Sequence, residues 1–249
     1  MTHGKKNATA TMHITTNNEW FEATVSAINI ESPTVKTLTF TAPYPIHNKA
    51  GQHFELRLTA ENGYQAARLY SAVRAGSGEK TLQLTIMDTL NGEVSPYVTE
   101  SLRIGDKVEI RGPFGNFFVW TPDEKRPVLL IGGGSGVVPM HAIFSAHQDS
   151  ASTAKMHLLY SSRTFDDILY KDEFLDNKDV TITLTKDAPS DWQGKSGRIN
   201  QAMVEEIVTE FPEKPLCYVC GMTKFVDAMT EALQANGITP DLIKTERFG

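Results

Sequence analysis

The sequence is short of cysteine, of long apolar runs and of excess positive charge. Its 24 Lys and Arg against 30 Asp and Glu give a formal net charge of -6, which argues against the clustered positive charge of a nucleic-acid interface. No stretch of the 249 residues approaches the apolar length of a membrane span, and the first residues lack the apolar core of a signal peptide. We therefore expect a cytoplasmic protein that neither binds nucleic acid nor spans a membrane.

The two cysteines, Cys217 and Cys220, have a spacing that could suggest a redox pair or half of a zinc site. They stand in an apolar segment that predicts a buried strand, and residues three apart on a strand point to opposite faces. We therefore expect neither a disulfide nor a shared metal ion, and the chain has no second Cys or His pair at ligand spacing. An ordinary [2Fe–2S] cluster needs four ligands, so none is expected within this chain.

Glycine, in contrast, is concentrated between Pro127 and Met140. The apolar residues 128–131 run into a glycine cluster and then into a segment of helical pattern, which is typical of a buried parallel strand that leads into a phosphate-binding turn. The turn consists of Gly132, Gly133, Gly134, Ser135 and Gly136. We expect its glycines to take positive φ and let the backbone approach a pyrophosphate, the alternative being a turn tightened only for packing.

The N-terminal half predicts short strands. Residues 1–18 are polar without periodicity and predict a disordered leader. Alternating segments between Gly, Pro and Asn breaks then predict strands at residues 21–28, 34–40, 53–58, 68–73, 81–86 and 107–111. Six strands at this spacing are typical of a small antiparallel barrel, with one short helix near residues 94–102.

The C-terminal half alternates strand and helix after a charged, proline-bracketed linker at residues 121–127. Strands are predicted at residues 128–131, 156–160, 180–184 and 216–220, and helices at about 137–147, 166–175, 199–210 and 223–235. This pattern predicts a parallel sheet with crossover helices. We therefore divide the chain into the leader, a barrel domain at residues 19–121 and an α/β domain at residues 122–249.

Residues 134–139, Gly-Ser-Gly-Val-Val-Pro, lack the third glycine of the usual dinucleotide fingerprint. They resemble the nicotinamide-binding turn of the ferredoxin–NADP reductase superfamily, which carries Gly-Thr/Ser-Gly-x-x-Pro. Four more family motifs have counterparts in the same order between residues 20 and 249; each is weak alone, and the ordered set is specific. The resemblance implies an all-β antiparallel Greek-key barrel that binds FAD, followed by an α/β doubly wound parallel-sheet domain that binds nicotinamide.

Two motifs of the barrel resemble the family's FAD site. The family's R-x-Y-S motif is matched by Arg68, Leu69, Tyr70 and Ser71. An Arg can clamp a pyrophosphate, a Tyr ring can lie against the flavin, and a Ser hydroxyl can donate to a ring nitrogen. The family's G-x-x-S motif is matched by Gly92 and Ser95, implying a phosphate contact. The alternatives are a plain surface strand and a simple helix cap by Ser95.

The strand that follows the glycine turn ends in Ser162 and Arg163, where an NAD-specific site would carry an acidic residue. By resemblance these two residues, with Lys171 as a third candidate, hold the 2′-phosphate of NADPH, and NADH remains possible. The alternative is that Arg163 forms a surface ion pair with Asp166 or Asp167.

The remaining motifs resemble the family's nicotinamide pocket. The C-G-x motif is matched by Cys220, Gly221 and Met222, and the ending of bacterial oxygenase reductases by Glu246 and Phe248. The resemblance implies that Cys220 lies beside the nicotinamide and that Phe248 shields the flavin. The alternatives are a buried inert Cys220 and a Phe248 packed as core at the domain junction. A further match, residues 112–117 to G-P-x-G-x-F, is interpreted as mainly structural.

By resemblance, Ser71, Cys220 and Glu246 surround the reacting atoms, and Glu246 relays a proton. The implied function is an FAD enzyme that passes electrons from NADPH to a ferredoxin, a flavodoxin or an oxygenase component. A flavin reductase that releases reduced flavin is one alternative. The others are an electron-transfer subunit that binds flavin but not nicotinamide, and a dinucleotide sensor without turnover.

Overall fold

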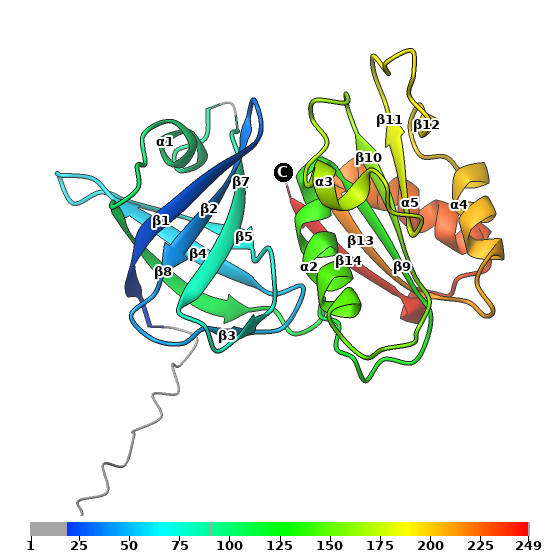
Figure 1. Ribbon diagram of the computed structural model, residues 1–249, viewed down its shortest axis with the longest axis horizontal. Helices are drawn as coiled ribbons and strands as arrows, with labels where there is room; N and C mark the ends of the chain where they lie inside the picture. Colours follow the sequence, from blue (N-terminus) through cyan, green and yellow to red (C-terminus); the bar gives the residue numbers. More distant parts are fainter. Residues whose placement is uncertain (1–18, 90, 249) are drawn as a thin grey trace, which may run out of the picture.

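The computed structural model describes residues 19–89 and 91–248, so the predicted leader, residues 1–18, lies outside the described residues. Two six-stranded sheets lie side by side, the first formed by the N-terminal half of the chain and the second by the C-terminal half (Figure 1). The change from one sheet to the other falls between β8 (Lys107–Phe114) and β9 (Val128–Gly133). The described helices include none that is long and apolar enough to cross a membrane.

The first sheet is antiparallel and has the strand order β5-β4-β8-β1-β2-β7. Its other strands are β1 (Phe21–Ser32), β2 (Val35–Thr41), β4 (His53–Thr59), β5 (Gln65–Ser71) and β7 (Thr81–Met87). A bridge between Ala72 and Leu84 joins the end of β5 to β7, which closes the sheet into a barrel. The chain crosses from β7 to place β8 between β4 and β1, so the predicted Greek-key barrel is confirmed.

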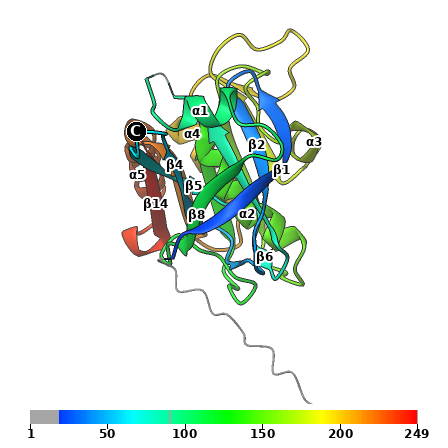
Figure 2. The same ribbon diagram turned by 90° about the vertical axis from the view of Figure 1, so that its left-hand side faces the viewer.

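The barrel core follows from the alternating pattern of its strands. Successive side chains of a strand point to opposite faces, so alternate residues of β2 and β4 enter the barrel. Leu38, Phe40, Phe54 and Leu56 are the inward residues, and each is fully buried. The same alternation leaves the outer face polar, and a single helix, α1 (Ser95–Glu100), lies at one end of the barrel (Figure 2).

The second sheet is parallel and has the order β12-β11-β10-β9-β13-β14. Its strands besides β9 are β10 (Met156–Ser162), β11 (Val180–Leu184), β12 (Lys195–Ser196), β13 (Leu216–Met222) and β14 (Ile243–Phe248). The chain builds the sheet outward from β9 in one direction and then from β13 in the other. The strand order therefore reverses between β9 and β13, the point where open α/β sheets bind their ligands.

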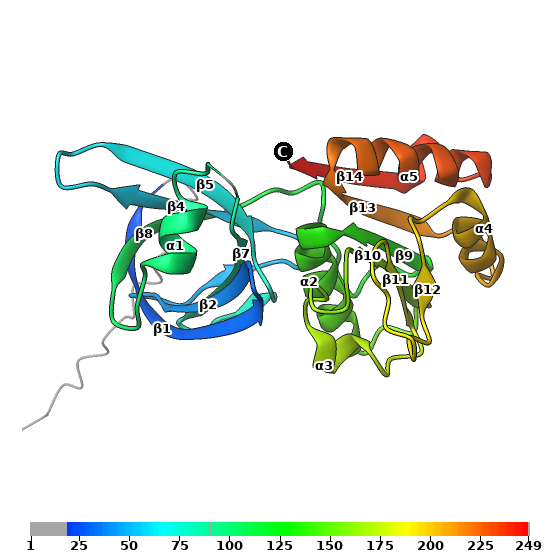
Figure 3. The same ribbon diagram turned by 90° about the horizontal axis from the view of Figure 1, so that it is seen from above.

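Helices cover both faces of the parallel sheet (Figure 3). They are α2 (Val137–Gln148), α3 (Lys171–Phe174), α4 (Gln201–Thr209) and α5 (Thr223–Ala235). Phe144 of α2 and Phe174 of α3 belong to one apolar core, whereas Val204 of α4 and Val226 of α5 belong to another. The doubly wound arrangement predicted from the sequence is therefore confirmed.

Cys217 and Cys220 lie on opposite faces of β13, as their spacing predicts. Cys217 packs in the core under α4 and α5, and Cys220 packs in the core under α2 and α3. Both are free thiols. Within the described residues, no group of three or more His, Cys, Asp or Glu side chains is placed to hold a metal ion.

The predicted helix at residues 166–175 is wrong over its first half. Only Lys171–Phe174 is helical, because Tyr170 takes the left-handed conformation, with φ of 55°, and interrupts the helix before it can form. The two-residue strands β3 (His47–Asn48), β6 (Gly76–Ser77) and β12 escape prediction because two residues show no period.

One apolar core extends across the junction between the two sheets. Val35, Val73, Phe118 and Trp120 of the N-terminal half share a cluster with residues of α2, α3 and the parallel sheet. The barrel therefore packs directly on the face that α2 and α3 cover, which fixes where the two halves of the site meet.

Candidate active site

The barrel side of the site lies on β5. Arg68 and Leu69 are exposed, whereas Tyr70 and Ser71 are half-buried. The hydroxyl of Tyr70 is buried, and no hydrogen-bond partner for it exists among the residues that the structure describes. Burial raises the pKa of Tyr70 to about 12, so the group stays a neutral donor. A buried hydroxyl without a partner is costly, which is the signature of a group that a bound molecule satisfies.

Arg68 is engaged by an acidic neighbour. Its Nη2 lies 3.0 Å from Oε2 of Glu93, and Tyr64 donates its hydroxyl to Oε1 of the same carboxylate at 2.9 Å. Both side chains of the Arg68–Glu93 pair are about half exposed. Glu93 stands between Gly92 and Ser95, so the sequence motif predicted to contact a phosphate also supplies a carboxylate that competes for the same guanidinium.

Ser95 does not cap α1, so that alternative is not observed. Its hydroxyl accepts the backbone N–H of Thr89 at 3.1 Å, and the cap position is Val94, which makes no side-chain cap bond. A Cβ on Gly92 would lie 2.8 Å from Oγ of Ser95. Gly92 and Ser95 therefore shape the loop before α1, and their predicted contact with FAD stays a prediction.

The prediction that all the turn glycines take positive φ is wrong. Gly133 and Gly136 have φ of -115° and -62°, and Gly134 alone among the four takes positive φ, +55°, with open space where a Cβ would stand. A Cβ on Gly136 would lie only 2.2 Å from the carbonyl oxygen of Cys220, so Gly136 permits the turn to pack on β13. Gly136 therefore serves packing, Gly134 leaves open space beside the turn, and the approach of a pyrophosphate to this backbone stays a prediction.

A side chain that the sequence reasoning missed connects the two sheets. His53 of β4 lies opposite Ser71 of β5, and its Nδ1 is 3.8 Å from Oε1 of Glu246. Glu246 of β14 in turn lies opposite Cys220 of β13. The fold therefore brings together the three predicted catalytic residues, Ser71, Cys220 and Glu246, through His53. No sequence signal marked His53, because its importance comes only from strand register.

Burial controls protonation in this group. It raises the pKa of Glu246 to about 7 and lowers the pKa of His53, and both shifts favour the neutral forms. The contact between them is therefore not an ion pair at neutral pH, despite the short separation. Burial and the nearby Glu246 raise the pKa of Cys220, which keeps its thiol protonated.

The ion pair considered as the alternative role of Arg163, with Asp166 or Asp167, is not formed. Arg163 is exposed, and it has no ion-pair partner within the described ranges. Asp166 instead lies 4.0 Å from Nζ of Lys171, and Asp167 accepts the hydroxyl of Thr164 at 2.8 Å. The neighbouring Ser162 is buried, and its hydroxyl donates to the Thr164 carbonyl at 3.3 Å. Arg163 is therefore available to a ligand, whereas the Ser162 side chain would have to turn outward.

The end of β14 faces the barrel in Figures 1 and 3. Phe248 lies opposite Met222 of β13, and the two side chains are 38% and 67% exposed. Neither belongs to a buried core cluster, so Phe248 is not core at the junction. Gly221 allows the close approach of the Phe225 ring behind them, at 2.7 Å from where a Cβ would stand.

Two family models match the chain. The oxidoreductase FAD-binding domain matches residues 22–119, and the oxidoreductase NAD-binding domain matches residues 130–231. The chain belongs to the ferredoxin reductase-like oxidoreductases. The resemblance to the ferredoxin–NADP reductase superfamily is thereby confirmed, as is the order of its FAD-binding and NAD-binding halves.

Similar proteins include reductases with several kinds of partner. The chain is 32% identical over 195 residues to NADH-cytochrome b5 reductase 1 of Lodderomyces elongisporus, covering 75% of this chain and 64% of that protein. It is 28% identical over 226 residues to the reductase subunit of glycine betaine monooxygenase of Chromohalobacter salexigens, covering 86% and 60%. A cytochrome P450 reductase of Amycolatopsis superposes with a TM-score of 0.80 at 25% identity, over 92% of this chain and 70% of that one. The chain thus spans just under two thirds of these two sequence relatives.

The residues present fit the cofactors of the two domains. On the barrel, the buried hydroxyl of Tyr70 lacks a partner among the residues that the structure describes. On the second sheet, two features suit a dinucleotide: the open backbone of Gly134, and Arg163, which is exposed and has no ion-pair partner in the described part of the chain. These features lie on different halves of the chain, the first on β5 of the barrel and the others just after β9 and β10.

Proposed function

We propose that this chain is a reductase that oxidises NADPH in preference to NADH and delivers the electrons through FAD to a separate redox protein. The observation that carries this proposal is the alignment of Ser71, His53, Glu246 and Cys220 across the junction of the FAD-binding and NAD-binding halves. Each half contributes two of the four residues. Such an arrangement suits a reaction between one molecule held by each half.

The chemistry divides between cofactors and protein. Bound FAD and nicotinamide supply the hydride transfer itself. Ser71 would present a hydroxyl to bound FAD, and Cys220 would present a neutral, compact thiol to bound nicotinamide. Glu246, with a pKa of about 7, holds a proton that it can exchange near neutral pH. Orientation alone of two bound reactants can lower the barrier by several kcal/mol, on the order of 7–11 kcal/mol in favourable cases.

Nucleotide choice follows from Arg163. The Arg163 guanidinium, which follows β10 and has no ion-pair partner among residues 19–89 and 91–248, suits the 2′-phosphate of NADPH. The sequence has no acidic residue at that position to bind the free 2′-hydroxyl of NADH. Lys171 is nearby in sequence but is already close to Asp166, which reduces its positive field. We therefore assign the preference mainly to Arg163.

The acceptor is a ferredoxin, a flavodoxin or an oxygenase component. The similarity to the reductase subunit of glycine betaine monooxygenase supports an oxygenase component, and the similarity to an NADH-cytochrome b5 reductase supports a separate protein as the acceptor. The two cysteines of the chain are buried on opposite faces of β13, so they do not hold an iron–sulfur cluster together. We therefore assign one-electron carriage to a group outside the residues that the structure describes.

A flavin reductase that releases its flavin is the second candidate, and one observation favours it. Glu93 occupies the guanidinium of Arg68, which opposes tight binding of the FAD pyrophosphate. The two candidates differ in the affinity for FAD and not in the reduction step.

One experiment separates these possibilities. The full chain is purified gently, its flavin content is measured from the visible spectrum, and the oxidised protein is mixed without oxygen with NADPH or NADH in a stopped-flow instrument. We expect bound FAD and faster bleaching by NADPH. Colourless protein with micromolar or weaker affinity for FAD would support the flavin-releasing reductase, and FAD that binds but is bleached by neither nucleotide would refute the reductase proposal.

A further inference from the structure

A polar cluster lies where the barrel packs on α2 and α3; it is buried at His141 and about half exposed at Arg74 and Glu173. We name it the His141 joint. It consists of His141, Tyr170 and Glu173 from the second half of the chain, and of Val73, Arg74 and Thr85 from the barrel. His141 is 1% exposed, although histidine has two polar atoms to satisfy. The proposed active-site residues do not include any member of this cluster.

Both ring nitrogens of His141 face acceptors. Nδ1 lies 3.0 Å from the carbonyl oxygen of Val73, and Nε2 lies 2.9 Å from Oε2 of Glu173. A carbonyl oxygen can only accept, so Nδ1 donates to it. The hydrogen bond from His141 is the largest cause that lowers the pKa of Glu173, so this carboxyl is ionised and also only accepts. This geometry suits a proton on each ring nitrogen.

The surroundings of the ring suit a cation. The Tyr170 ring stacks on His141 with 4.0 Å between centroids and 22° between planes, an arrangement that stabilises a positive charge. Tyr170 also reaches into the barrel, where its hydroxyl lies 2.7 Å from Oγ1 of Thr85. Its left-handed backbone is strained for a bulky residue, and such strain persists where surrounding contacts hold it.

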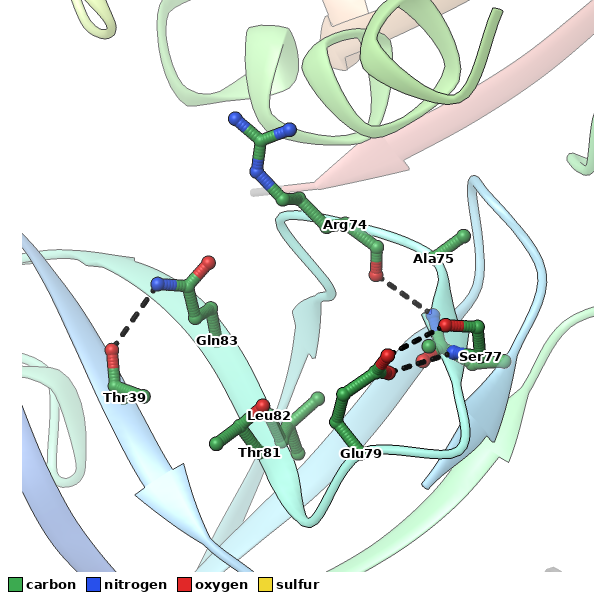
Figure 4. A pocket seen from close by; sticks show the side chains of 10 residues that line it. Thr39, Arg74, Ala75, Ser77, Glu79, Thr81, Leu82 and Gln83 are labelled. Atoms are coloured by element: carbon green, nitrogen blue, oxygen red, sulfur yellow. Dashed lines mark hydrogen bonds between the residues drawn. The ribbon is translucent and has the colours of Figure 1, made fainter. Parts of the chain in front are cut away.

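Glu173 receives a cation from each half of the molecule. Its Oε1 lies 3.0 Å from Nη2 of Arg74, and Arg74 also approaches Asp149 at 3.9 Å. Figure 4 shows the side chain of Arg74 extending away from the hollow beside it and toward the helix that the barrel packs against. Ser145 is a further neighbour of His141, with its hydroxyl 3.4 Å from Nε2. The carboxylate of Glu173 therefore lies between the guanidinium of Arg74 on the barrel and the His141 ring on α2.

The His141 joint lies between the segment that follows Ser71 at the end of β5 and the helix α2 that follows the glycine turn. Val73 follows Ser71 by two residues on the same backbone segment, and His141 stands on α2, the helix that begins directly after the glycine turn. A shift of α2 along the barrel would therefore move the nicotinamide site relative to Ser71. Other polar contacts cross the junction, such as the hydrogen bond from the Tyr218 hydroxyl to the Val119 carbonyl at 2.8 Å, but they involve β13 and β14 and not α2.

We propose that His141, held as an imidazolium between Val73 and Glu173, is a positioning residue that fixes the nicotinamide site at its working distance from the flavin face. This inference rests on the proposed function for its effect on rate. Its structural part can be tested without any turnover. That part is the doubly protonated ring and the hydrogen bonds that join the two halves of the chain through it.

The first test observes the ring itself. Protein labelled with ¹⁵N in histidine and loaded with FAD is examined by NMR at neutral pH, with His141→Gln used to assign the signal. We expect the Nδ1 and Nε2 shifts of a ring protonated on both nitrogens. In Glu173→Gln the amide can donate to Nε2, so the ring is expected to carry a single proton. A singly protonated ring in the unsubstituted protein would overturn the proposal.

The second test measures alignment. In His141→Gln we expect the limiting rate of flavin reduction at saturating NADPH to fall roughly tenfold to hundredfold, the scale of a displacement near 1 Å. The dissociation constants for FAD and NADPH should change less than about threefold. Glu173→Gln, which keeps a hydrogen bond to the ring, should lose less of the rate.

A matched control is His157→Gln, because His157 is also a buried histidine but bonds within its own half, to Thr181 at 2.9 Å. It should leave the limiting rate unchanged. If His141→Gln lowers thermal stability but reduces flavin at the normal limiting rate, His141 is merely structural and the proposal fails. If no variant, nor the unsubstituted protein, is reduced by either nucleotide, the proposed function fails while the NMR result still decides the state of the ring.

Discussion

The guanidinium of Arg68 donates to the carboxylate of Glu93 across 3.0 Å, and Tyr64 holds the other oxygen of that carboxylate at 2.9 Å. The residue predicted to bind the FAD pyrophosphate therefore has an internal competitor with the same charge as a phosphate. Both partners are about half exposed, so the pair is weak and a doubly charged ligand can replace it. The affinity for FAD is set by the difference between these two interactions.

Substitutions of this pair should change FAD affinity in opposite directions. Arg68→Ala should weaken FAD binding by about 1.5–3 kcal/mol, the scale of a hydrogen bond to a charged group. Glu93→Gln should tighten binding by at most about fivefold, since an exposed ion pair contributes roughly 0.2–1 kcal/mol. Quenching of FAD fluorescence measures both. In an Arg68→Ala background the Glu93 change should have no effect; equal tightening in both backgrounds would show that Glu93 acts on FAD directly.

Arg163→Ala should remove most of the preference for NADPH. Loss of one charge-assisted contact of about 1.5–3 kcal/mol corresponds to roughly a tenfold to hundredfold fall in kcat/KM for NADPH, with little change for NADH. Steady-state rates with both nucleotides measure it. Arg126→Ala removes the same charge from an exposed position in the connection between the sheets and serves as the control. If the Arg163→Ala enzyme keeps its preference for NADPH, a residue other than Arg163 contacts the 2′-phosphate.

Local sequence pattern was sufficient to predict most of the architecture. Two patterns predict strands correctly: the alternation around Phe40 and Phe54, and the unbroken apolar run at residues 128–131. Alternation indicates a strand buried on one face, and an apolar run indicates a strand buried on both faces. The opposite orientation of Cys217 and Cys220 follows from the geometry of a strand alone. These features depend on near neighbours in the chain.

Relationships between distant segments escaped prediction. His53 enters the site only through its register with Ser71 and its approach to Glu246 across the junction. Tyr170 breaks its helix because contacts with His141 and the barrel hold it in a left-handed conformation that local propensity disfavours. A short stretch of sequence cannot predict these features, because they depend on contacts with distant residues that override the local conformational preference.

Glu246 should make stability depend on pH in a direction opposite to that of an ion-paired carboxylate. Its pKa is raised from 4.5 to about 7 in the folded protein, so between these values the folded state binds more protons than the unfolded state. Stability from this group is therefore full below about pH 4.5 and is lost as pH rises through about 7. Thermal unfolding between pH 5 and 8 measures the slope, and Glu246→Gln should flatten it. If the substitution leaves the slope unchanged, the pKa of Glu246 is not the one that is raised.

Phe248 provides the sharpest test of the end of the chain. Its side chain is 38% exposed and lies outside the buried clusters, so Phe248→Ala should cost less stability than the roughly 3–5 kcal/mol typical of a buried Phe. Because the end of β14 faces the barrel beside Met222, the substitution should instead change the flavin spectrum and the affinity for the nicotinamide nucleotide.

Truncation after Thr245 removes Glu246 as well, so it should keep FAD but slow flavin reduction by roughly 10²–10⁴, the contribution of a positioned proton donor. Phe248→Ala with Glu246 intact isolates the aromatic ring from the proton, and Phe174→Ala, which removes a buried Phe from the junction core, gives the stability loss of a true core residue for comparison. A Phe248→Ala protein that unfolds as easily as the Phe174→Ala protein, yet is reduced at the normal rate, would assign Phe248 to packing.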